Sequence, residues 1–355
     1  MHDPTWLLVH YQSDAQRAAT SRLAADLRLP SPERLTPAQL AAAVEERRLK
    51  RSQTDAKTRI AVIIPFRDAW KMTRNCIESL LKQDRSHFEL TVCLVDNGSQ
   101  RNDTKEGIQL LKQNWNSLVK TADSSLPVLH IIHDERPFNF SQLNNSAVEF
   151  LNDPSRGAIP EFLLFLNNDT LWEEPHTLEK LVHFAKLSPR IGAVGCTLLY
   201  KNSNVQHLFL APGVKLAGAH PCKGICLSRK QSWYADPRPV PAVTGALLLV
   251  SVINFKKVGG FDTALATSCQ DIDFCIKLQE LGLENWVLPD VFVRHFETST
   301  RLKKNQAQEI TYVSTKWGSR LAMNSYYSPE ISRWSERPAL HWGESAYPWS
   351  AVLNS

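Results

Sequence analysis

Short runs of apolar residues recur through the middle of the chain, at intervals that leave room for helices between them. The first run is IAVIIPF, which is rich in β-branched side chains and is interrupted by Pro65. Four more runs follow, within residues 89–99, 126–135, 161–169 and 191–200. Runs of this kind, without a regular polar alternate position, are typical of strands buried on both faces of a sheet.

Two stretches between these runs have the apolar spacing of helices, Ala69 to Gln83 and His176 to Leu187. Strands that alternate with helices form right-handed crossovers and lie mostly parallel in one sheet. We therefore predict an α/β fold with a mostly parallel central sheet flanked by helices. Ligands bind such sheets at the carboxyl ends of the strands, so polar residues at those ends are the candidates for chemistry.

The texture of the chain divides it into three parts. The first part is rich in Ala, Leu, Arg, Glu and Gln, and Thr36 with Pro37 fits the N-cap and first position of a helix. It is predicted to be a helical appendage. The second part holds the strand-forming runs, and the third is predicted to begin as a helix and to end as an ordered tail rich in Trp, Tyr and Pro. The boundaries are 1–57, 58–302 and 303–355, and the middle part falls into halves, 58–200 and 201–302.

Composition narrows the class of protein. With 355 residues, 43% of them hydrophobic, the chain can bury a large core, which excludes disordered and fibrous classes. Its 41 Lys and Arg against 36 Asp and Glu give a net charge of +5. This mild excess favours anionic partners, such as phosphorylated substrates or an anionic membrane surface, but lacks the dense basic stripe expected for nucleic-acid binding.

Seven cysteines, an odd number and mostly in apolar segments, indicate a reduced compartment. Cys222 and Cys226 lie near His207 and His220, which suggests zinc as an alternative, but a second pair with zinc-finger spacing is missing. No secretory signal and no apolar stretch of membrane-spanning length is recognised. We therefore expect a cytoplasmic protein, with peripheral contact at the inner membrane face left open.

Three oxygen-bearing side chains, Asn167, Asn168 and Asp169, follow a predicted buried strand. A hard divalent cation such as Mg²⁺ or Mn²⁺ prefers such ligands. An ordinary Asn/Asp turn is the equally good alternative from these residues alone.

Two further clusters lie later in the chain. Asp271 and Asp273 stand at the start of a predicted amphipathic helix, where one of them serves as a cap and the second exceeds what capping needs. His295 and Glu297 share one side of a strand-like segment. A histidine there can ligate a metal, although a simply hydrogen-bonded histidine is the commoner case.

Together these clusters form an ordered series of motifs that resembles family-2 glycosyltransferases of the GT-A fold, a Rossmann-like α/β architecture. The similarity covers about residues 58–302, and its details look like the bacterial branch that builds rhamnose-rich and other surface polysaccharides. The motifs, in order, are VIIPFRDAW, LVDNGSQRND, RPFNFSQLNNSA, FLLFLNNDT, TGALLLVSVINFKKVGGFD, CQDIDFCIKLQELG and VRHFETSTR, followed by SYYSPEIS.

The resemblance implies an inverting transfer of a sugar from a UDP- or dTDP-linked donor to a hydroxyl of a glycan or lipid-linked glycan. Residues 58–200 would then be the nucleotide-sugar half and residues 201–302 the acceptor half. Asp169 and His295 would hold Mn²⁺ or Mg²⁺, and Asp271 would be the general base. The residues implied to bind the nucleotide sugar are Pro65, Arg67, Asp68, Asp96, Asn97, Asn144, Asn167 and Asn168, and those of the acceptor and base region are Gly245, Gln270 and Asp273.

Two positions depart from the family pattern. Gln270 stands where the family often has Glu, and the base-reading turn is Asp96–Asn97 instead of an Asp pair. The Asn97 amide is still expected to pair with a pyrimidine edge through one donor and one acceptor.

Two other classes compete with this hypothesis. A non-catalytic domain that binds a nucleotide sugar or carbohydrate would keep the same fold, because fold alone does not establish catalysis. A nucleotidyltransferase is disfavoured, since PFRDAW replaces the Gly-rich, Lys-bearing phosphate loop that it would need after the first strand. The N-terminal part is left as a surface for a partner enzyme or a membrane, and the aromatic C-terminus as a tail or a sugar-stacking surface.

Overall fold

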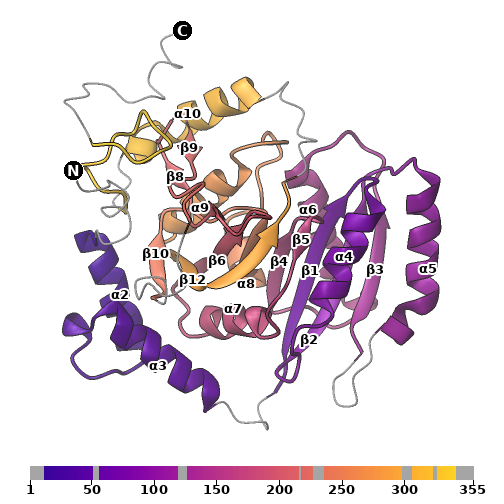
Figure 1. Cartoon of the computed structure of the whole chain (residues 1–355), viewed down its shortest axis with the longest axis horizontal. Coiled ribbons are helices and arrows are strands. Elements are labelled where there is room, and N and C mark those ends of the chain that lie inside the picture. The colour runs from indigo at the N-terminus through magenta and orange to yellow at the C-terminus, as the bar shows by residue number, and fades with distance from the viewer. Residues whose placement is uncertain are drawn as a thin grey trace.

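The structure is a computed structural model of the chain, shown in Figure 1. Glu297 is the last described residue of the HFETSTR motif, so the remainder of that motif lies outside the described residues. The residues that the structure describes are 12–50, 56–118, 126–215, 217–226, 236–297, 306–322 and 326–340.

One large sheet organises the described residues. Four of its strand pairs are parallel, namely β1–β2, β1–β4, β2–β3 and β6–β12, whereas β11 lies antiparallel between β4 and β6. The predicted mostly parallel sheet is confirmed. In order across the sheet its strands are β10 (Arg238–Val240), β12 (Glu284–His295), β6 (Ile191–Leu199), β11 (Leu247–Ser251), β4 (Phe162–Leu166), β1 (Thr58–Phe66), β2 (Phe88–Asp96) and β3 (Val128–His133), with β5 (Thr170–Leu171) on β12 and β7 (Val205–His207) on β6.

Two apolar cores lie on the two faces of this sheet. In β1, Ile60, Val62 and Ile64 join one core, while Ala61 and Ile63 join the other, as the two-residue repeat of a strand requires. The first core is covered by α2 (Asp14–Asp26), α3 (Pro37–Leu49), α4 (Trp70–Leu80), α5 (Asn102–Leu118) and α7 (Thr177–Ala185). The second is covered by α6 (Phe140–Leu151), α8 (Val252–Lys257), α9 (Gln270–Glu280) and α10 (Gln306–Ala322). Both faces are therefore buried, which explains the continuous apolar runs.

The strand register gathers polar residues at one edge of the sheet. Phe66 at the end of β1 pairs with Asp96, and Asp96 pairs with His133 at the end of β3. The antiparallel β11 begins where β4 ends, because Leu247 pairs with Leu166. Residues after β1, β2, β3 and β4 and those before β11 therefore meet at the same edge.

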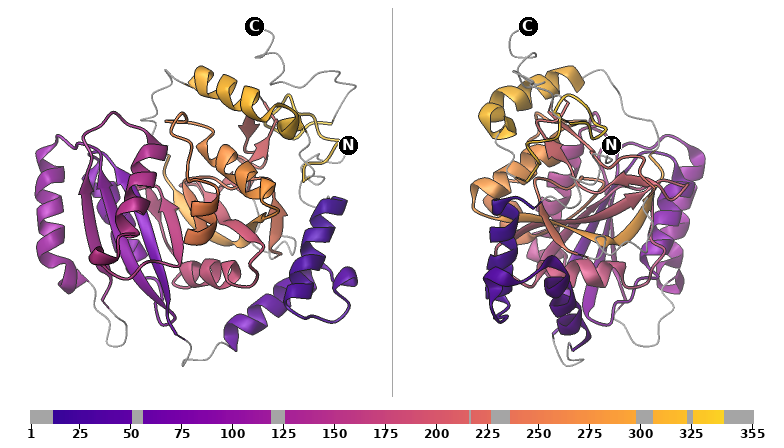
Figure 2. Two further views of the ribbon diagram at one scale, coloured as in Figure 1. Left: turned by 180° about the vertical axis from the view of Figure 1, so that it is seen from behind. Right: turned by 60° about the vertical axis from the view of Figure 1, so that its left-hand side comes forward.

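The N-terminal part is helical, as predicted. Its two described α-helices each begin with a capping box, Ser13 with Gln16 in α2 and Thr36 with Gln39 in α3. The predicted cap at Thr36 is confirmed. The two helices lie at one end of the molecule and α5 at the other, as both Figure 1 and Figure 2 show.

This helix pair is attached to the sheet domain by polar contacts as well as by its apolar face. The Gln16 side chain donates to the Pro239 carbonyl at 3.1 Å, and Arg22 binds Glu284 at 2.7 Å. A surface for a partner or a membrane was one expectation for this part, but α2 and α3 use one side to pack on their own chain. Within the described residues, no helix combines the length and apolarity that crossing a membrane requires.

The C-terminal helix α10 packs over the core that contains α9. Its residues Val313 and Leu321 are fully buried there, and Gly318 interrupts the helical dihedral angles. The predicted helix after residue 305 is confirmed. Residues 326–340 follow as irregular structure, and the rest of the predicted aromatic tail lies outside the described residues.

We predict that Gly213→Ala is more destabilising than Gly224→Ala, although both glycines have positive φ, 73° and 84°. A Cβ at Gly213 would lie 2.2 Å from the Leu321 carbonyl oxygen of α10, whereas a Cβ at Gly224 would have nothing within 4 Å. Left-handed backbone costs either alanine about 1–2 kcal/mol, and overpacking adds about 1–3 kcal/mol at Gly213 alone. Urea unfolding of both variants measures the difference, and equal free energies of unfolding would contradict this packing of α10.

Candidate functional site

Asp169 and His295 form a buried pair at the edge where the strands end. Asp169 lies in the turn between β4 and β5, and His295 is the last residue of β12. Because His295 pairs with Thr170 of β5, the imidazole lies next to the turn. Its Nε2 is 3.0 Å from Asp169 Oδ1, and both residues are 5% exposed. The structure thus brings together the two residues predicted to hold a metal.

Gln206 of β7 fixes the orientation of this histidine. Its Oε1 is 2.6 Å from His295 Nδ1, while its Nε2 donates to the His295 carbonyl and to Glu297 Oε2. With the Gln206 amide in this orientation, Nδ1 carries the proton that Oε1 accepts. In the neutral imidazole, Nε2 then presents a lone pair to Asp169.

The two facing atoms fit a divalent cation. A lone pair on Nε2 and a carboxylate oxygen 3.0 Å apart repel each other unless a proton or a metal ion lies between them. Two adjacent ligands of an octahedral ion, each about 2.1 Å from it, are about 3 Å apart. Imidazole nitrogen and carboxylate oxygen are both common metal ligands in proteins. The donor set at Asp169 and His295 therefore fits a divalent cation.

The two asparagines of the turn point in different directions. Asn167 Nδ2 is 3.2 Å from His295 Nε2, so this side chain borders the Asp169–His295 pair. Asn168 instead donates to the Thr73 hydroxyl of α4 at 2.9 Å and holds the turn against that helix. Of the three predicted oxygen-bearing residues, only Asn167 and Asp169 face His295.

The loops after β1 and β2 are bound to each other through their carboxylates. Asp68 Oδ1 accepts from the backbone N–H groups of Gln100 and Arg101, both at 2.9 Å. Asp96 Oδ1 accepts from the Ser99 N–H, and its Oδ2 is 3.2 Å from His133 Nδ1. Both predicted nucleotide-binding carboxylates therefore shape the loops that border the strand ends.

Asn97 differs from its expected role. Both of its amide hydrogens are used inside the protein, on the carbonyls of Asp134 and Arg136 at 2.8 Å. Its side chain is therefore left with an acceptor only, which corrects the expectation that it offers a pyrimidine one donor and one acceptor. Within the described part of the chain, the buried Oδ1 atoms of Asn97 and Asn144 have no hydrogen-bond partner.

Three other residues predicted to bind the nucleotide sugar lie on or near the edge where the parallel strands end. Pro65 is half-buried near the end of β1, and Arg67 is exposed just after it. Asn144 lies in the second turn of α6, where its amide donates to the Phe140 carbonyl at 2.8 Å. These residues share the edge with Asp96, but no contact among them defines a base pocket.

Asp271 faces the loop that precedes β11. Its Oδ2 accepts from the Gly245 N–H at 3.0 Å, and its Oδ1 accepts from the Ile272 N–H at 2.9 Å. A side chain at Gly245 would have to fit beside Phe140, whose ring lies 3.1 Å from the position of an added Cβ. The half-exposed carboxylate of Asp271 is therefore held by backbone donors on a tightly packed loop.

This loop also connects Asp271 to the Asp169–His295 pair. The Asn167 N–H donates to the Ala246 carbonyl at 3.0 Å, so the turn after β4 is bonded to the segment that holds Asp271. On the other side of the segment, the Thr244 N–H donates to His207 Nε2 at 3.3 Å. His207 follows Gln206 in β7, and neighbouring residues of a strand point to opposite faces. β7 thus supports His295 with one residue and the loop of Asp271 with the next.

Asp273 has a different environment from Asp271. Two residues along a helix turn the side chain by about 200°, so the two carboxylates point away from each other. Asp273 is fully buried, and its oxygens bind Lys277, Lys316 and the Trp317 indole N–H. Its contacts join α9 to α10, in place of the acceptor-region role expected for it.

Gln270 precedes Asp271 at the start of α9 and is 9% exposed. Within the described residues, its Oε1 has no hydrogen-bond partner.

The alternative zinc centre does not form among the described residues. His207 Nδ1 is 2.9 Å from His220 Nδ1, and Cys222 and Cys226 do not join them in a group of possible ligands. Burial lowers the pKa of His207 well below its usual range, with His220 as a second cause. The imidazole is therefore neutral, which agrees with Nε2 accepting a backbone hydrogen.

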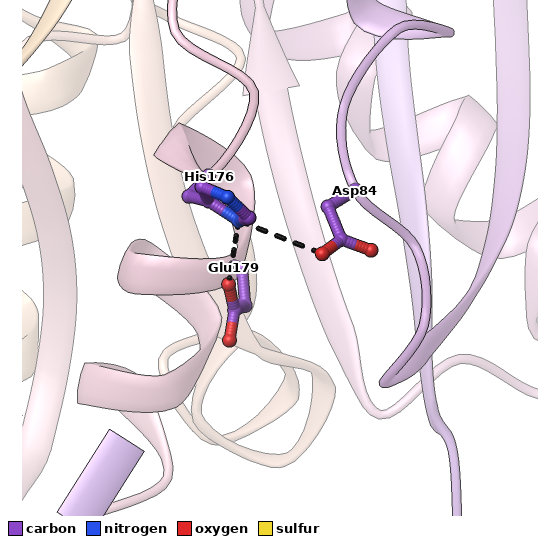
Figure 3. A group of neighbouring side chains, drawn as sticks. All are labelled: Asp84, His176 and Glu179. Carbon is purple, nitrogen blue, oxygen red and sulfur yellow. Dashed lines mark hydrogen bonds and ion pairs between the residues drawn. The ribbon is translucent and has the colours of Figure 1, made fainter. Parts of the chain in front are cut away.

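Asp84, His176 and Glu179 do gather, as Figure 3 shows, with ligand atoms within 4.8 Å of one another. His176 Nδ1 is 3.1 Å from Glu179 Oε2 and 3.5 Å from Asp84 Oδ2. The same Glu179 oxygen also binds Arg48 Nη1 of α3 at 2.9 Å. A cation on this oxygen would lie next to the guanidinium, so the group is better suited to joining α3, α7 and the loop after α4.

The chain is similar to known proteins in sequence and in fold. Residues 61–209 match the family described as glycosyl transferase family 2. Over 68% of this chain, the sequence is 31% identical to the O-antigen biosynthesis protein RfbC of Myxococcus xanthus. Over 45% of this chain, it is 25% identical to the rhamnosyltransferase WbbL of Escherichia coli. It spans 18% of the length of the first protein and 61% of the second, and 29% of a further, uncharacterised relative.

A solved structure shares the fold. The mannosyltransferase PcManGT from Pyrobaculum calidifontis, in complex with GDP-Man and Mn²⁺, superposes with a TM-score of 0.52 at 16% identity. The superposition covers 87% of this chain and 81% of the other. At this identity the likeness establishes the fold alone.

Gln206 was not found from the sequence, because a single glutamine beside a histidine in a short strand has no recognisable signature. We predict that Gln206→Ala weakens Mn²⁺ binding about 10- to 100-fold, as loss of the partner of a ligating histidine usually does. Titration of Mn²⁺ followed by electron paramagnetic resonance measures the affinity. Gln83→Ala is the matched control, because Gln83 is equally buried but bonds Glu174 and Leu178 instead. Equal affinities of both variants would contradict the role of Gln206.

Proposed function

Since residues 61–209 match the family described as glycosyl transferase family 2, we propose that the chain transfers a sugar from a nucleoside diphosphate sugar to a hydroxyl of a glycan or glycolipid. The GT-A fold predicted from the sequence is confirmed by the mannosyltransferase likeness. The observation that carries the proposal is the Asp169–His295 pair, bonded through one short loop to the carboxylate of Asp271. Sugar transfer needs a group that stabilises the leaving diphosphate and a base for the acceptor hydroxyl at one site, and the Asp169–His295 pair and Asp271 are suited to these two tasks.

The donor side is assigned to the strand ends. Asp169 and His295 hold a divalent ion, Mn²⁺ or Mg²⁺, and Asn167 lies beside them. When bound, this ion supplies positive charge to the nucleoside diphosphate as the glycosidic bond breaks. Pro65, Arg67, Asp68, Asp96, Asn97, Asn144 and Asn168 are assigned to shaping and bordering the nucleotide-sugar site.

Asp271 is assigned as the general base. Each of its oxygens accepts a backbone hydrogen, which orients the carboxylate, and the residue is half-exposed, so an acceptor hydroxyl can approach it. A carboxylate in this position removes the hydroxyl proton as the oxygen attacks the anomeric carbon. Attack on the face opposite the departing diphosphate inverts the anomeric centre in a single displacement. Gly245 and Gln270 border this step, whereas Asp273 supports the helix from its other side.

The biological setting is proposed from the relatives. One is named for O-antigen biosynthesis and another for rhamnosyl transfer, so surface polysaccharide synthesis with a UDP- or dTDP-linked donor fits this chain best. Residues 58–200 would bind the donor and residues 201–302 the acceptor, with His295 contributed to the donor side by the second half.

A non-catalytic nucleotide-sugar or carbohydrate-binding domain is the second candidate. The likeness to the mannosyltransferase is a likeness of fold, and fold alone does not establish catalysis. The two functions differ in whether bound donor is consumed.

We predict that Asp271→Asn lowers turnover about 100-fold or more, because an amide has no basic oxygen to accept the hydroxyl proton. The affinity for the donor stays within about twofold, since Asp271 lies on the acceptor side. Transfer from a panel of UDP- and dTDP-sugars with Mn²⁺ gives the rate, and calorimetry gives the affinity.

Asp153→Asn, a partly exposed carboxylate in the turn after α6, is the control and should keep full turnover. Wild-type protein that binds a donor without transferring or hydrolysing it would support the binding domain. Failure to bind any donor would refute both the transferase and the nucleotide-sugar-binding domain.

A further inference from the structure

The loop between α8 and α9 carries the proposed base into position. Its last part runs from Asp262 to Cys269 and ends in a left-handed residue, since Cys269 has a φ of 62°. The Cys269 carbonyl accepts the first helical hydrogen bond, from the Asp273 N–H at 2.9 Å. Whatever fixes this loop therefore fixes the start of α9, where Gln270 and Asp271 lie.

Glu309 of α10 binds this loop from one side. Its Oε1 accepts from the N–H groups of Ala266 and Thr267, at 3.0 and 3.1 Å. Its Oε2 accepts from the Ser268 N–H at 2.7 Å and from the hydroxyls of Thr267 and Ser268 at 2.8 and 2.7 Å. One side chain thus gathers three consecutive backbone N–H groups and two hydroxyls.

The start of α6 binds the same loop from the other side, through carbonyl groups. The Phe140 N–H donates to the Ala266 carbonyl at 2.8 Å, and the Ser141 hydroxyl donates to the Leu265 carbonyl at 2.6 Å. Donors of the loop therefore face α10 and its acceptors face α6. The contacts from α10 and from α6 together form a clamp on the loop. Because Phe140 also packs on Gly245, which bonds Asp271, the α6 side of this clamp reaches the proposed base directly.

The chemistry of Glu309 suits this position better than a neutral residue would. It is 4% exposed, and a buried carboxylate is costly unless its oxygens are hydrogen-bonded. Here five donors converge on it, and hydrogen bonds to a charged acceptor are about twice as strong as neutral ones. Such a group holds a loop of consecutive N–H donors in one conformation.

Further contacts fix α10 itself. Tyr312 and Lys316 bind Asp262 at the beginning of this part of the loop, at 2.8 and 2.7 Å. Lys316 and Trp317 bind Asp273 of α9. The helix is therefore anchored at both ends of the loop that Glu309 holds in the middle.

We propose that Glu309 is a positioning residue for the general base, and that α10 is part of the catalytic unit. The Glu309 carboxylate holds residues 266–268. As a result, α9 starts with the Asp271 side chain directed at the Gly245 N–H and at the acceptor hydroxyl. The proposal rests on the proposed function, in which Asp271 is the base. Glu309 itself lies 4% exposed beneath the loop and acts through it.

Glu309→Gln tests the proposal with little change in size. The amide presents an NH₂ group to N–H donors, so the loop loses part of its anchor. We expect the kcat for transfer to fall about 10- to 100-fold, since small misplacements of a catalytic group have effects of this size. Donor affinity and Mn²⁺ affinity should stay within about twofold, and amide hydrogen exchange should become faster at residues 266–271.

Glu179→Gln is the matched control. Glu179 is also a buried carboxylate, 5% exposed, but it bonds Arg48 and His176 away from the strand ends. Its loss should lower the melting temperature without changing kcat or the exchange of residues 266–271. Ser268→Ala, which removes a single hydroxyl donor, should lower kcat in the same direction by a smaller factor and serves where Glu309→Gln folds poorly.

The outcomes separate this inference from the proposed function. Unchanged exchange at residues 266–271 in Glu309→Gln overturns the clamp, and so does faster exchange with an unchanged kcat. Exchange needs no turnover, so a wild-type protein that transfers no sugar refutes the proposed function while the clamp is still judged by exchange.

Discussion

The antiparallel insertion of β11 is the constraint on which the site depends. The parallel strands β1, β2 and β4 end at one edge of the sheet, and β11 begins at that edge because it runs the other way between β4 and β6. The segment Thr244–Ala246 is thereby placed beside the turn of Asn167, and the two are bonded. Without this reversal, the residues that bind Asp271 would lie at the opposite edge, away from Asp169.

Three carboxylates around the site are held by backbone N–H donors. Asp68 binds two backbone N–H groups, Asp271 binds two, and Glu309 binds three with two hydroxyls. Backbone donors are fixed by the fold, so each carboxylate stabilises a loop and is itself oriented by it. Asp169 differs, since its Oδ1 faces a histidine nitrogen whose proton lies on the other side. That contrast distinguishes the predicted metal ligand from Asp68, Asp271 and Glu309.

The sequence was informative where a local pattern has one physical outcome. The β-branched run before Pro65, the cap at Thr36 and the acidic start of α9 all appear in the structure where they were predicted. The proximity of Asp169 and His295, which are 126 residues apart, followed from the resemblance to a family and not from spacing. Gln206 and Glu309 have no such pattern, because their partners lie 89 and about 42 residues away.

By itself the sequence determined the α/β class and the alternation of strands and helices, and it predicted the strand ends as the place of chemistry, because periodicity and chain direction dictate these. Only the tertiary structure decided what each polar side chain does. Asp271 and Asp273 are equivalent in the sequence, yet a turn of about 200° along a helix directs one to Gly245 and the other to Lys316 and Trp317. A hydrogen-bonding group is assigned by its neighbours in space, and those neighbours are set by packing.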